Sequence, residues 1–308
     1  MSEIWEDSRT TIAGRCLCGS VNYAFRGYRS MSAGICHCSR CRKMTGSAYV
    51  HFTALASPEQ VDFQGEEYLS QFAGTHGLPE DETQPIRSTT FCVHCGSCVP
   101  KPLKGAPEYQ SILAGTVPDM PVHQSSNFHF YTKSKCPWVS IPESEPQSLT
   151  VKDGYQNPDQ PDLERYVESG RITGSCLCGE VSFAARHPIG MMNCHCSRCR
   201  LARGAAHATN LFVLQRNFEW LSGQNNVIQF RVPDAERFTQ GFCGDCGSPV
   251  PRPRDNRVPD DRMGIPAGCL DSDPGIKPAG HIFVGSKAPW FAFFDDLPQW
   301  KERPDRSI

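Results

Sequence analysis

Short alternations of apolar and polar residues run along the chain, and they predict β-strands. Val21, Tyr23 and Phe25 alternate with polar or small residues, and Val181 and Phe183 begin the same pattern later in the chain. An apolar residue at every second position is typical of a half-buried strand. Further strands are expected at 48–52, 87–91, 111–114 and 128–131, and again at 211–214, 237–242, 263–265 and 281–284.

Turn-forming residues separate these short patterns, and no long stretch repeats apolar residues at helical spacing. The 26 glycines and 25 prolines supply many turn signals between the expected strands. The sequence therefore predicts a mainly β fold. At 308 residues the chain is long enough for two domains that each bury a core.

Sequence landmarks of the first half return in the second half in the same order. Their offsets lie between 151 and 160 residues, which indicates a tandem duplication of one domain. We expect a first domain at 1–145, a polar linker at 146–170 and a second domain at 171–308. The repeated landmarks are 14–19 and 174–179, 36–42 and 194–200, 91–97 and 242–248, and 134–138 and 286–290.

Cysteines carry the candidate chemistry of this chain, which has 17 of them. Each half repeats seven thiols in register, as Cys-x-Cys, Cys-x-Cys-x-x-Cys and Cys-x-x-Cys. Seven ligands divide into a closed tetrahedral zinc site of four and an open site of three, whose fourth position is left for water or substrate. We expect up to four Zn²⁺ per chain. The expected ligands are Cys16, Cys18, Cys92 and Cys95; Cys36, Cys38 and Cys41; Cys176, Cys178, Cys243 and Cys246; and Cys194, Cys196 and Cys199.

Three cysteines have no counterpart in the other half. They are Cys98, Cys136 and Cys269. Cys98 follows Cys95 by three residues, so a fourth ligand, a resolving thiol and a buried inert thiol all stay open for it.

The start of the chain has acids where a secretory signal needs bases and an apolar run, and no stretch is long enough to span a bilayer. We therefore expect a cytoplasmic protein with reduced thiols and no membrane partner. A net charge of -2 gives no electrostatic reason to expect nucleic acid as a partner. Because a duplicated domain can replace a homodimer, we also expect a monomer whose halves form a pseudo-dimer.

The motifs together resemble a known family. Gly-x-Cys-x-Cys-Gly-x-Val is followed by Cys-His-Cys-x-x-Cys-Arg-Lys-x-x-Gly-Ser, by Phe-Cys-x-x-Cys-Gly-Ser, and by Ala-Gly and Pro-Trp. This order resembles the glutathione-dependent formaldehyde-activating enzyme family, which also contains centromere protein V, over 12–140 and again over 172–300. The resemblance implies a β-tent fold of packed antiparallel sheets with two zinc sites per domain. It also implies, for the founding enzymes, the joining of formaldehyde to glutathione.

The triplets are the expected reaction centres. Coordination to zinc ionises a thiol, and the metal also polarises a carbonyl oxygen as a Lewis acid. Cys38 and Cys196, the middle thiols, are the candidate catalytic residues, because they are placed to leave the metal as substrate arrives. A three-cysteine zinc capped by a fourth protein ligand, and purely structural, stays open. His37 and His195 lie between ligands in an extended segment, so we expect their side chains to point away from the metal and to pack or support the site rather than to bind the metal.

Residues that follow the first triplet are the expected substrate contacts. Arg42 and Lys43 are placed to pair with a substrate carboxylate, although solvated surface charge explains them equally well. Gly46 and Ser47 are placed to offer backbone and hydroxyl donors, although Gly-Ser is also an ordinary turn.

The two halves differ around the triplets. The first half is nearer to the family pattern, so we expect it to be the active half if only one is active, with the second half covering it or completing its pocket. The opposite division stays open. The differing pairs are Lys43 and Leu201, Ser47 and Ala205, Tyr49 and His207, and Cys98 and Pro249.

Three classes of function are consistent with these residues. The first is a zinc-dependent carbon-sulfur lyase or synthase acting on adducts of a glutathione-like thiol with formaldehyde or another small carbonyl compound. The second is a glutathione-independent zinc hydrolase or lyase of a metabolite or xenobiotic adduct. The third is a zinc-stabilised binding module without catalysis. Fold alone does not choose among them.

Overall fold

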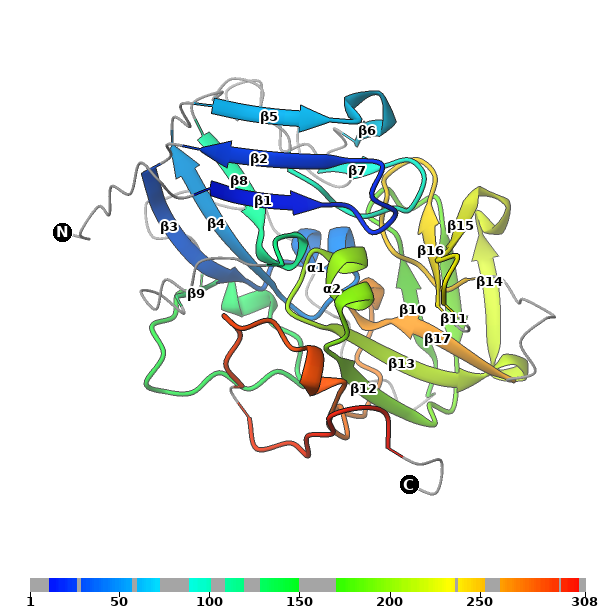
Figure 1. The fold of residues 1–308 in the computed structure, drawn as a ribbon. Helices are drawn as coiled ribbons and strands as arrows, with labels where there is room; N and C mark the ends of the chain where they lie inside the picture. Colours follow the sequence, from blue (N-terminus) through cyan, green and yellow to red (C-terminus); the bar gives the residue numbers. More distant parts are fainter. Residues whose placement is uncertain are drawn as a thin grey trace.

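The structure is a computed structural model, and its strands and two short α-helices confirm the predicted mainly β fold. Figure 1 shows the strands of the first half on one side of the molecule and those of the second half on the other, with the two helices near the centre. The structure describes residues 11–26, 29–56, 60–72, 89–100, 109–118, 128–149, 170–235, 238–252, 261–293 and 295–304.

The first half contains three sheets. A three-stranded antiparallel sheet contains, in spatial order, β1 (Thr11–Arg15), β2 (Asn22–Arg26) and β5 (Gln60–Gln64). A four-stranded sheet contains, in order, β8 (Tyr109–Leu113), β4 (Val50–Ala56), β3 (Arg29–Cys36) and β9 (His129–Phe130), with only the β3–β9 pair parallel. A third, antiparallel pair contains β6 (Leu69–Phe72) and β7 (Thr89–Cys92).

The second half repeats this topology strand for strand. Its three-stranded sheet contains β10 (Ile172–Ser175), β11 (Ser182–Ala185) and β14 (Phe218–Ser222). Its four-stranded sheet contains β17 (Arg262–Pro266), β13 (Ala208–Leu214), β12 (Gly190–Cys194) and β18 (His281–Ile282), and again only the β12–β18 pair is parallel. The last pair contains β15 (Val227–Arg231) and β16 (Thr239–Cys243). The matching strand orders confirm the duplication.

Alternation predicted the right strands where one face of the sheet is buried. In β2, Tyr23 and Phe25 are buried while their neighbours are not, and both side chains belong to the core of the first half. The expected strands at 48–52, 87–91, 111–114 and 128–131 correspond to β4, β7, β8 and β9, with bounds shifted by one to four residues. The structure adds β1, β3, β5 and β6 and their counterparts, which the alternation did not mark.

Two helices carry the triplets, α1 (Ser39–Thr45) and α2 (Ser197–Arg203). Each has seven residues, which is too short for an apolar stripe of period 3.6 to be visible in the sequence. Each ends at a glycine in the left-handed region, with φ of 66° at Gly46 and 62° at Gly204.

Reciprocal contacts join the two halves around an approximate twofold axis. The amide of Gly268 donates to the carbonyl of Gly46 at 3.1 Å, and the equivalent amide of Gly115 donates to that of Gly204 at 3.2 Å. A β-carbon at either Gly46 or Gly204 would meet atoms of the opposite half within 3.0 Å, so the close approach requires glycine at both positions. Equivalent residues also meet each other across the axis. These pairs are Phe91 with Phe242, at 6.4 Å between ring centroids, and the hydroxyl of Tyr49 with Nε2 of His207, at 2.9 Å.

Each half also extends a tryptophan into the other. Trp138 packs against the core of the second half, and Trp290 packs against the core of the first half. Both tryptophans therefore contribute to the packing that holds the halves together.

The start of the predicted linker packs onto the first half. The amide of His129 donates to the carbonyl of Pro146, and the amide of Ser148 donates back to the carbonyl of His129, both at 2.8 Å. Residues 150–169 lie outside the described residues, so the predicted boundaries at 145 and 170 stay a prediction. Among the described residues, neither helix has the length or the apolar character that crossing a bilayer requires.

Candidate metal centres

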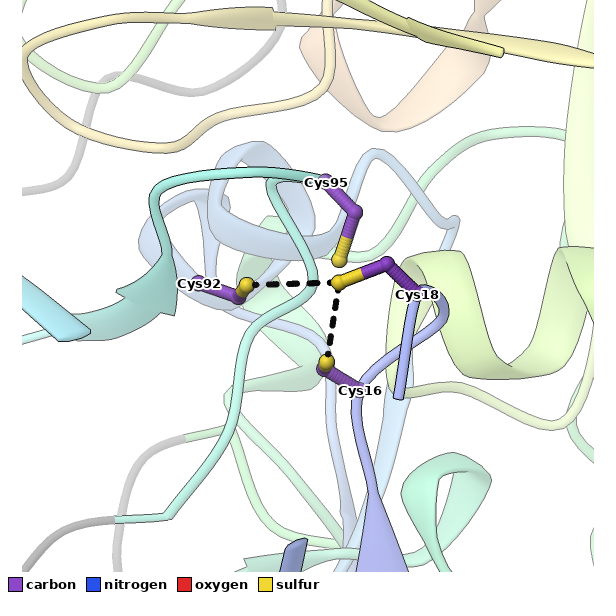
Figure 2. A group of neighbouring side chains, drawn as sticks. All are labelled: Cys16, Cys18, Cys92 and Cys95. Atoms are coloured by element: carbon purple, nitrogen blue, oxygen red, sulfur yellow. Dashed lines mark hydrogen bonds between the residues drawn. The ribbon is translucent and has the colours of Figure 1, made fainter. Parts of the chain in front are cut away.

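The first four-cysteine group joins two segments that are far apart in sequence. Cys16 and Cys18 follow β1, whereas Cys92 ends β7 and Cys95 follows it. The four sulfur atoms lie within 4.8 Å of one another. Figure 2 shows the sulfur of Cys18 between those of Cys16 and Cys92, at distances of 3.4 and 3.7 Å. The predicted grouping of these four thiols is therefore present in the fold.

Electrostatics in this group favour a bound cation. Hydrogen bonds from Cys16 and Cys92 lower the pKa of Cys18 strongly, and the thiol of Cys16 lowers the pKa of Cys95 to about 7. The pKa of Cys92 is raised, chiefly by its contacts with Cys16 and Cys18. Four thiols this close cannot all ionise without a compensating charge, and a soft divalent ion supplies it. The donor set fits Zn²⁺ with four thiolate ligands.

The second four-cysteine group repeats this geometry. The sulfur of Cys178 lies 3.3 Å from that of Cys176 and 3.7 Å from that of Cys243, and the sulfur atom of Cys246 lies within 4.8 Å of the others. Hydrogen bonds with neighbouring thiols lower the pKa of Cys178 and raise that of Cys176. Both halves therefore offer the same closed, four-sulfur environment.

A serine after each Cys-x-x-Cys-Gly fixes the opposing loop. Ser97 Oγ accepts from the amide of Leu17 at 3.0 Å, and Ser248 Oγ accepts from that of Leu177 at the same distance. Because Leu17 and Leu177 lie between two ligands of their groups, these bonds hold the Cys-x-Cys loops in place.

The triplets lie where a strand passes into a helix. Cys36 ends β3, Cys38 caps α1, and Cys41 lies in its first turn. The sulfur of Cys38 accepts from the amide of Cys41 at 3.4 Å and lies 3.4 Å from that of Cys36. The second triplet is built in the same way, and Cys196 accepts from the amide of Cys199 at 3.4 Å. The three sulfur atoms of each triplet lie within 4.8 Å of one another, so each triplet could hold a metal ion.

The two triplets differ in exposure. Cys38 is 1% exposed and packs with Cys36 and Tyr131, whose own exposure is 5%. Cys196 is half-buried, and Ser197 after it is exposed. Hydrogen bonds from the thiols of Cys194 and Cys199 lower the pKa of Cys196 to about 3. The second triplet therefore combines an ionisable thiol with access from solvent.

A buried histidine pair lies beside each triplet, and the sequence analysis missed it. Nε2 of His37 lies 2.8 Å from Nδ1 of His129, and Nε2 of His195 lies 2.8 Å from Nδ1 of His281. Nε2 of His281 also lies 3.0 Å from the carboxylate of Asp295. Neither His37 nor His195 belongs to the possible metal groups of the described residues, in agreement with their expected packing role. The recurrence of both histidines in register was the available signal.

Among the expected substrate contacts, Lys43 directs its side chain to the second half. Its ammonium group forms an ion pair with Asp271 and donates to Ser175 Oγ, both in the second half. Arg42 is 1% exposed, and its Nε and Nη1 atoms are buried without a hydrogen-bond partner among the described residues. A role for either residue in substrate binding stays a prediction.

The other two expected contacts lie at the interface between the halves. Gly46 accepts the hydrogen bond from Gly268, and Ser47 Oγ donates to the carbonyl of His207 at 3.0 Å. The backbone oxygen of Gly46 and the hydroxyl of Ser47 are therefore engaged across the interface. Their proposed contact with substrate also stays a prediction.

The unmatched cysteines are buried. Burial raises the pKa of Cys98 and of Cys269 to about 12 each, and burial also raises the pKa of Cys136. None of the three belongs to the possible metal groups of the described residues. The interpretation of Cys98 as a buried, inert thiol agrees with this environment.

Comparisons with known proteins identify a family that both halves resemble. The sequence model of the glutathione-dependent formaldehyde-activating enzyme matches residues 11–134 and again residues 171–286. Among solved structures, the chain is similar to a Rhodobacter sphaeroides protein from a structural genomics programme. The two share 23% identity with a TM-score of 0.27, over 34% of this chain and 97% of that chain. No curated protein matches this chain.

Proposed function

Since the chain belongs to the glutathione-dependent formaldehyde-activating enzyme family, we propose that it is a carbon-sulfur lyase or synthase acting on thiol adducts of small carbonyl compounds. The thiol is glutathione or a molecule like it, and the carbonyl compound is formaldehyde or a close relative. The observation that supports this function best is a three-cysteine group, matched to the family, whose middle thiol is half-buried and readily ionised.

The proposed reaction conserves atoms and oxidation state. In the forward direction, the sulfur of the thiol forms a bond to the carbonyl carbon, and the carbon-oxygen double bond becomes a single bond. The proton that the thiol loses ends on the new hydroxyl group. In the reverse direction the same carbon-sulfur bond breaks, so the reaction needs no oxidant or reductant.

The second triplet is the proposed reaction centre, with Cys194, Cys196 and Cys199 as the residues that would hold zinc. Zinc, when bound, supplies a Lewis acid and stabilises a thiolate near neutral pH. The backbone amides of Cys199 and Arg198 stabilise negative charge on the sulfur of Cys196. The ring of His195, between the ligands Cys194 and Cys196, is fully buried and packs against His207, His281 and Phe291.

Exposure supports the second half as the working half, although residue identities around the triplets favoured the first. A substrate must reach the open ligand position, and the thiol of Cys38 lies under Tyr131 in a nearly closed environment. We therefore propose that the first triplet stabilises the fold and that the second binds substrate. The four-cysteine groups would hold two structural zinc ions.

NMR exchange spectroscopy tests this function directly. The zinc-loaded chain is added to formaldehyde, glutathione and their adduct, and the exchange rate is compared with the spontaneous rate. We expect acceleration by the unchanged chain, and a loss of about 100-fold or more in Cys196→Ser, because a ligand of the reaction centre is removed. Cys38→Ser is the matched substitution in the first triplet. It should retain most of the acceleration per folded, zinc-loaded chain, and circular dichroism checks its folding because the first triplet is proposed to stabilise the fold.

The other outcomes lead to different functions. Loss in Cys38→Ser with retention in Cys196→Ser would move the reaction to the first half. Unchanged exchange together with a shifted glutathione spectrum would indicate a thiol-binding zinc centre with another electrophile as its substrate. No effect of either kind would contradict the proposal and favour a glutathione-independent hydrolase or a binding module.

Metal analysis tests the sites themselves. We expect four zinc ions per reduced chain, and two would mean that only the four-cysteine groups are filled. The 17 cysteines, all of which lie in the described residues, form no disulfide, which suits a reducing compartment such as the cytoplasm. The reciprocal interface leads us to propose a monomer in solution.

A further inference from the structure

A narrow crevice lies where the two halves meet, and the proposed reaction centre does not include it. Tyr49 and Trp138 line it from the first half, and Asn193, His207 and Asp295 line it from the second. Its volume is about 20 Å³. A water molecule needs roughly 10–15 Å³, so the crevice accepts only a very small molecule.

Its polar groups suit a neutral molecule. Thr209 donates to Oδ1 of Asn193 at 2.8 Å, which leaves the amide N–H groups of Asn193 as the donors it can offer. Oδ1 of Asp295 accepts from Leu297 at 3.1 Å and lies 3.0 Å from Nε2 of His281, so Oδ2 is the acceptor it can offer. No lysine or arginine lines the crevice as described, so an anion would find no opposite charge there.

The imidazole of His207 does not supply a positive charge either. It is 4% exposed, and burial holds its pKa well below the usual range of histidine. It is neutral at pH 7, and Nε2 shares a hydrogen bond with the hydroxyl of Tyr49 at 2.9 Å. The crevice therefore presents donors and acceptors without a cationic wall.

Three connections join the crevice to the second triplet. Asn193 directly precedes the ligand Cys194 in β12. The ring of His207 lies 5.0 Å from that of His195, which is placed between two ligands. Asp295 reaches His195 through His281, by hydrogen bonds of 3.0 and 2.8 Å.

We propose that this crevice binds the small carbonyl reactant, or its hydrate, beside the second triplet. The inference rests on the proposed function, to which it adds a site for the second reactant. A glutathione-like thiol is far larger than the crevice, so it approaches the triplet from another side. One extra methyl group in a filled pocket changes selectivity by about 10- to 200-fold, and we expect a preference of that size for formaldehyde over acetaldehyde.

A binding experiment that does not depend on catalysis tests the site. Formamide is an unreactive carbonyl compound of three heavy atoms, and saturation-transfer NMR reports its binding to the zinc-loaded full-length chain. Ser140 lies exposed at the rim of the crevice, and Ser140→Trp places an indole over the opening. Ser144→Trp is the matched control, because Ser144 is also exposed and does not line the crevice. We expect the formamide signal to be lost only in Ser140→Trp.

Kinetics with a widened crevice give the second readout. Leu297→Ala removes side-chain volume from the wall. We expect kcat/KM for acetaldehyde relative to formaldehyde to rise about tenfold, with an unchanged KM for the thiol.

Two results would overturn the inference. One is formamide binding that survives Ser140→Trp or is absent from the unchanged chain, and the other is an unaltered aldehyde preference in Leu297→Ala. If the unchanged chain did not accelerate exchange but bound formamide in a way that Ser140→Trp abolished, the proposed function would fail while a small-carbonyl site remained.

Discussion

Helices α1 and α2 carry the same cysteine spacing, yet they contact the opposite half through different chemistry. Lys43 of α1 forms an ion pair with Asp271 and donates to Ser175, the residue before Cys176 of the second four-cysteine group. Its counterpart Leu201 packs, 6% exposed, in an apolar cluster that contains Cys16 and Cys92 of the first group. Each helix that carries a triplet therefore rests on the other half's four-cysteine group, by charge on one side and by hydrophobic contact on the other.

Lys43 and Leu201 both lie at the interface between the halves. Lys43 has its ion-pair partner in the second half, and Leu201 belongs to a cluster whose buried cysteines are those of the first half. In the duplicated chain, both are explained by the half they face. It also means that the four metal groups are coupled through one interface, so damage to one half should reach the other.

The largest effect should come from breaking a four-cysteine group. Cys92→Ser and Cys243→Ser each remove one ligand, and structural zinc contributes on the order of 10 kcal/mol to folding. If the halves depend on each other, either substitution should unfold the whole chain in one transition. Circular dichroism and metal analysis measure this, and Cys269→Ala, at a buried thiol outside the groups, should cost at most about 2 kcal/mol. Two separate transitions would show that the halves fold independently.

The apolar contact of Leu201 with the first half predicts a smaller effect. Leu201→Ala leaves a cavity against the first four-cysteine group, and such truncations cost about 2–5 kcal/mol. We also expect faster loss of metal from that group to a chelator, because α2 covers it. Urea unfolding and chelator competition measure the two effects. A cost below 1 kcal/mol would mean that α2 does not support the first half.

Low pH should destabilise the folded chain through protonation of His207 at the interface. Burial keeps its pKa in the folded chain well below that of the unfolded chain, which is about 6.5, so the unfolded chain binds the extra proton first. Above pH 6.5 the titration of His207 does not reduce the free energy of unfolding. Below pH 6.5 it reduces the free energy of unfolding by about 1.4 kcal/mol per pH unit. His207→Gln should reduce the slope of stability against pH by that amount between pH 6.5 and 5. An unchanged slope would place the titration at other groups.

The ion pair between Lys43 and Asp271 predicts the smallest effect. The Lys43 and Asp271 side chains are 15% and 35% exposed, whereas the Arg26 and Asp62 side chains of a surface pair are 53% and 46% exposed. We expect Lys43→Met to cost about 1 kcal/mol and Arg26→Met about 0.3 kcal/mol, because exposed pairs are screened by water. Urea unfolding measures both. Equal costs would mean that the lysine gains nothing from the interface.

Local patterns predicted the part of the fold that is local. The alternation around Tyr23 sufficed for β2, and the recurrence of seven cysteines sufficed for the four thiol groups, because the side-chain period and the number of ligands can be read along the chain. The alternation did not suffice for β1 or β10, although Ile12 and Ile172 of these strands belong to the core. Helix α1 was not predicted, because seven residues are too few for apolar residues to repeat visibly at helical spacing. The partners of Lys43 and Ser47 lie more than one hundred residues away, and no spacing in the sequence specifies which half a side chain will face.

The hydrogen bond between Tyr49 and His207 has a consequence for how the molecule arose. These residues occupy equivalent positions and meet at the approximate axis. In a homodimer, a residue on the twofold axis meets its own copy, so a tyrosine there faces a tyrosine and a histidine faces a histidine. A mixed pair becomes available once the two copies change separately, as they can in one chain. The bond between Tyr49 and His207 is therefore an asymmetric contact at an approximately symmetric interface. It favours the pairing of a first half with a second half over the pairing of two identical halves.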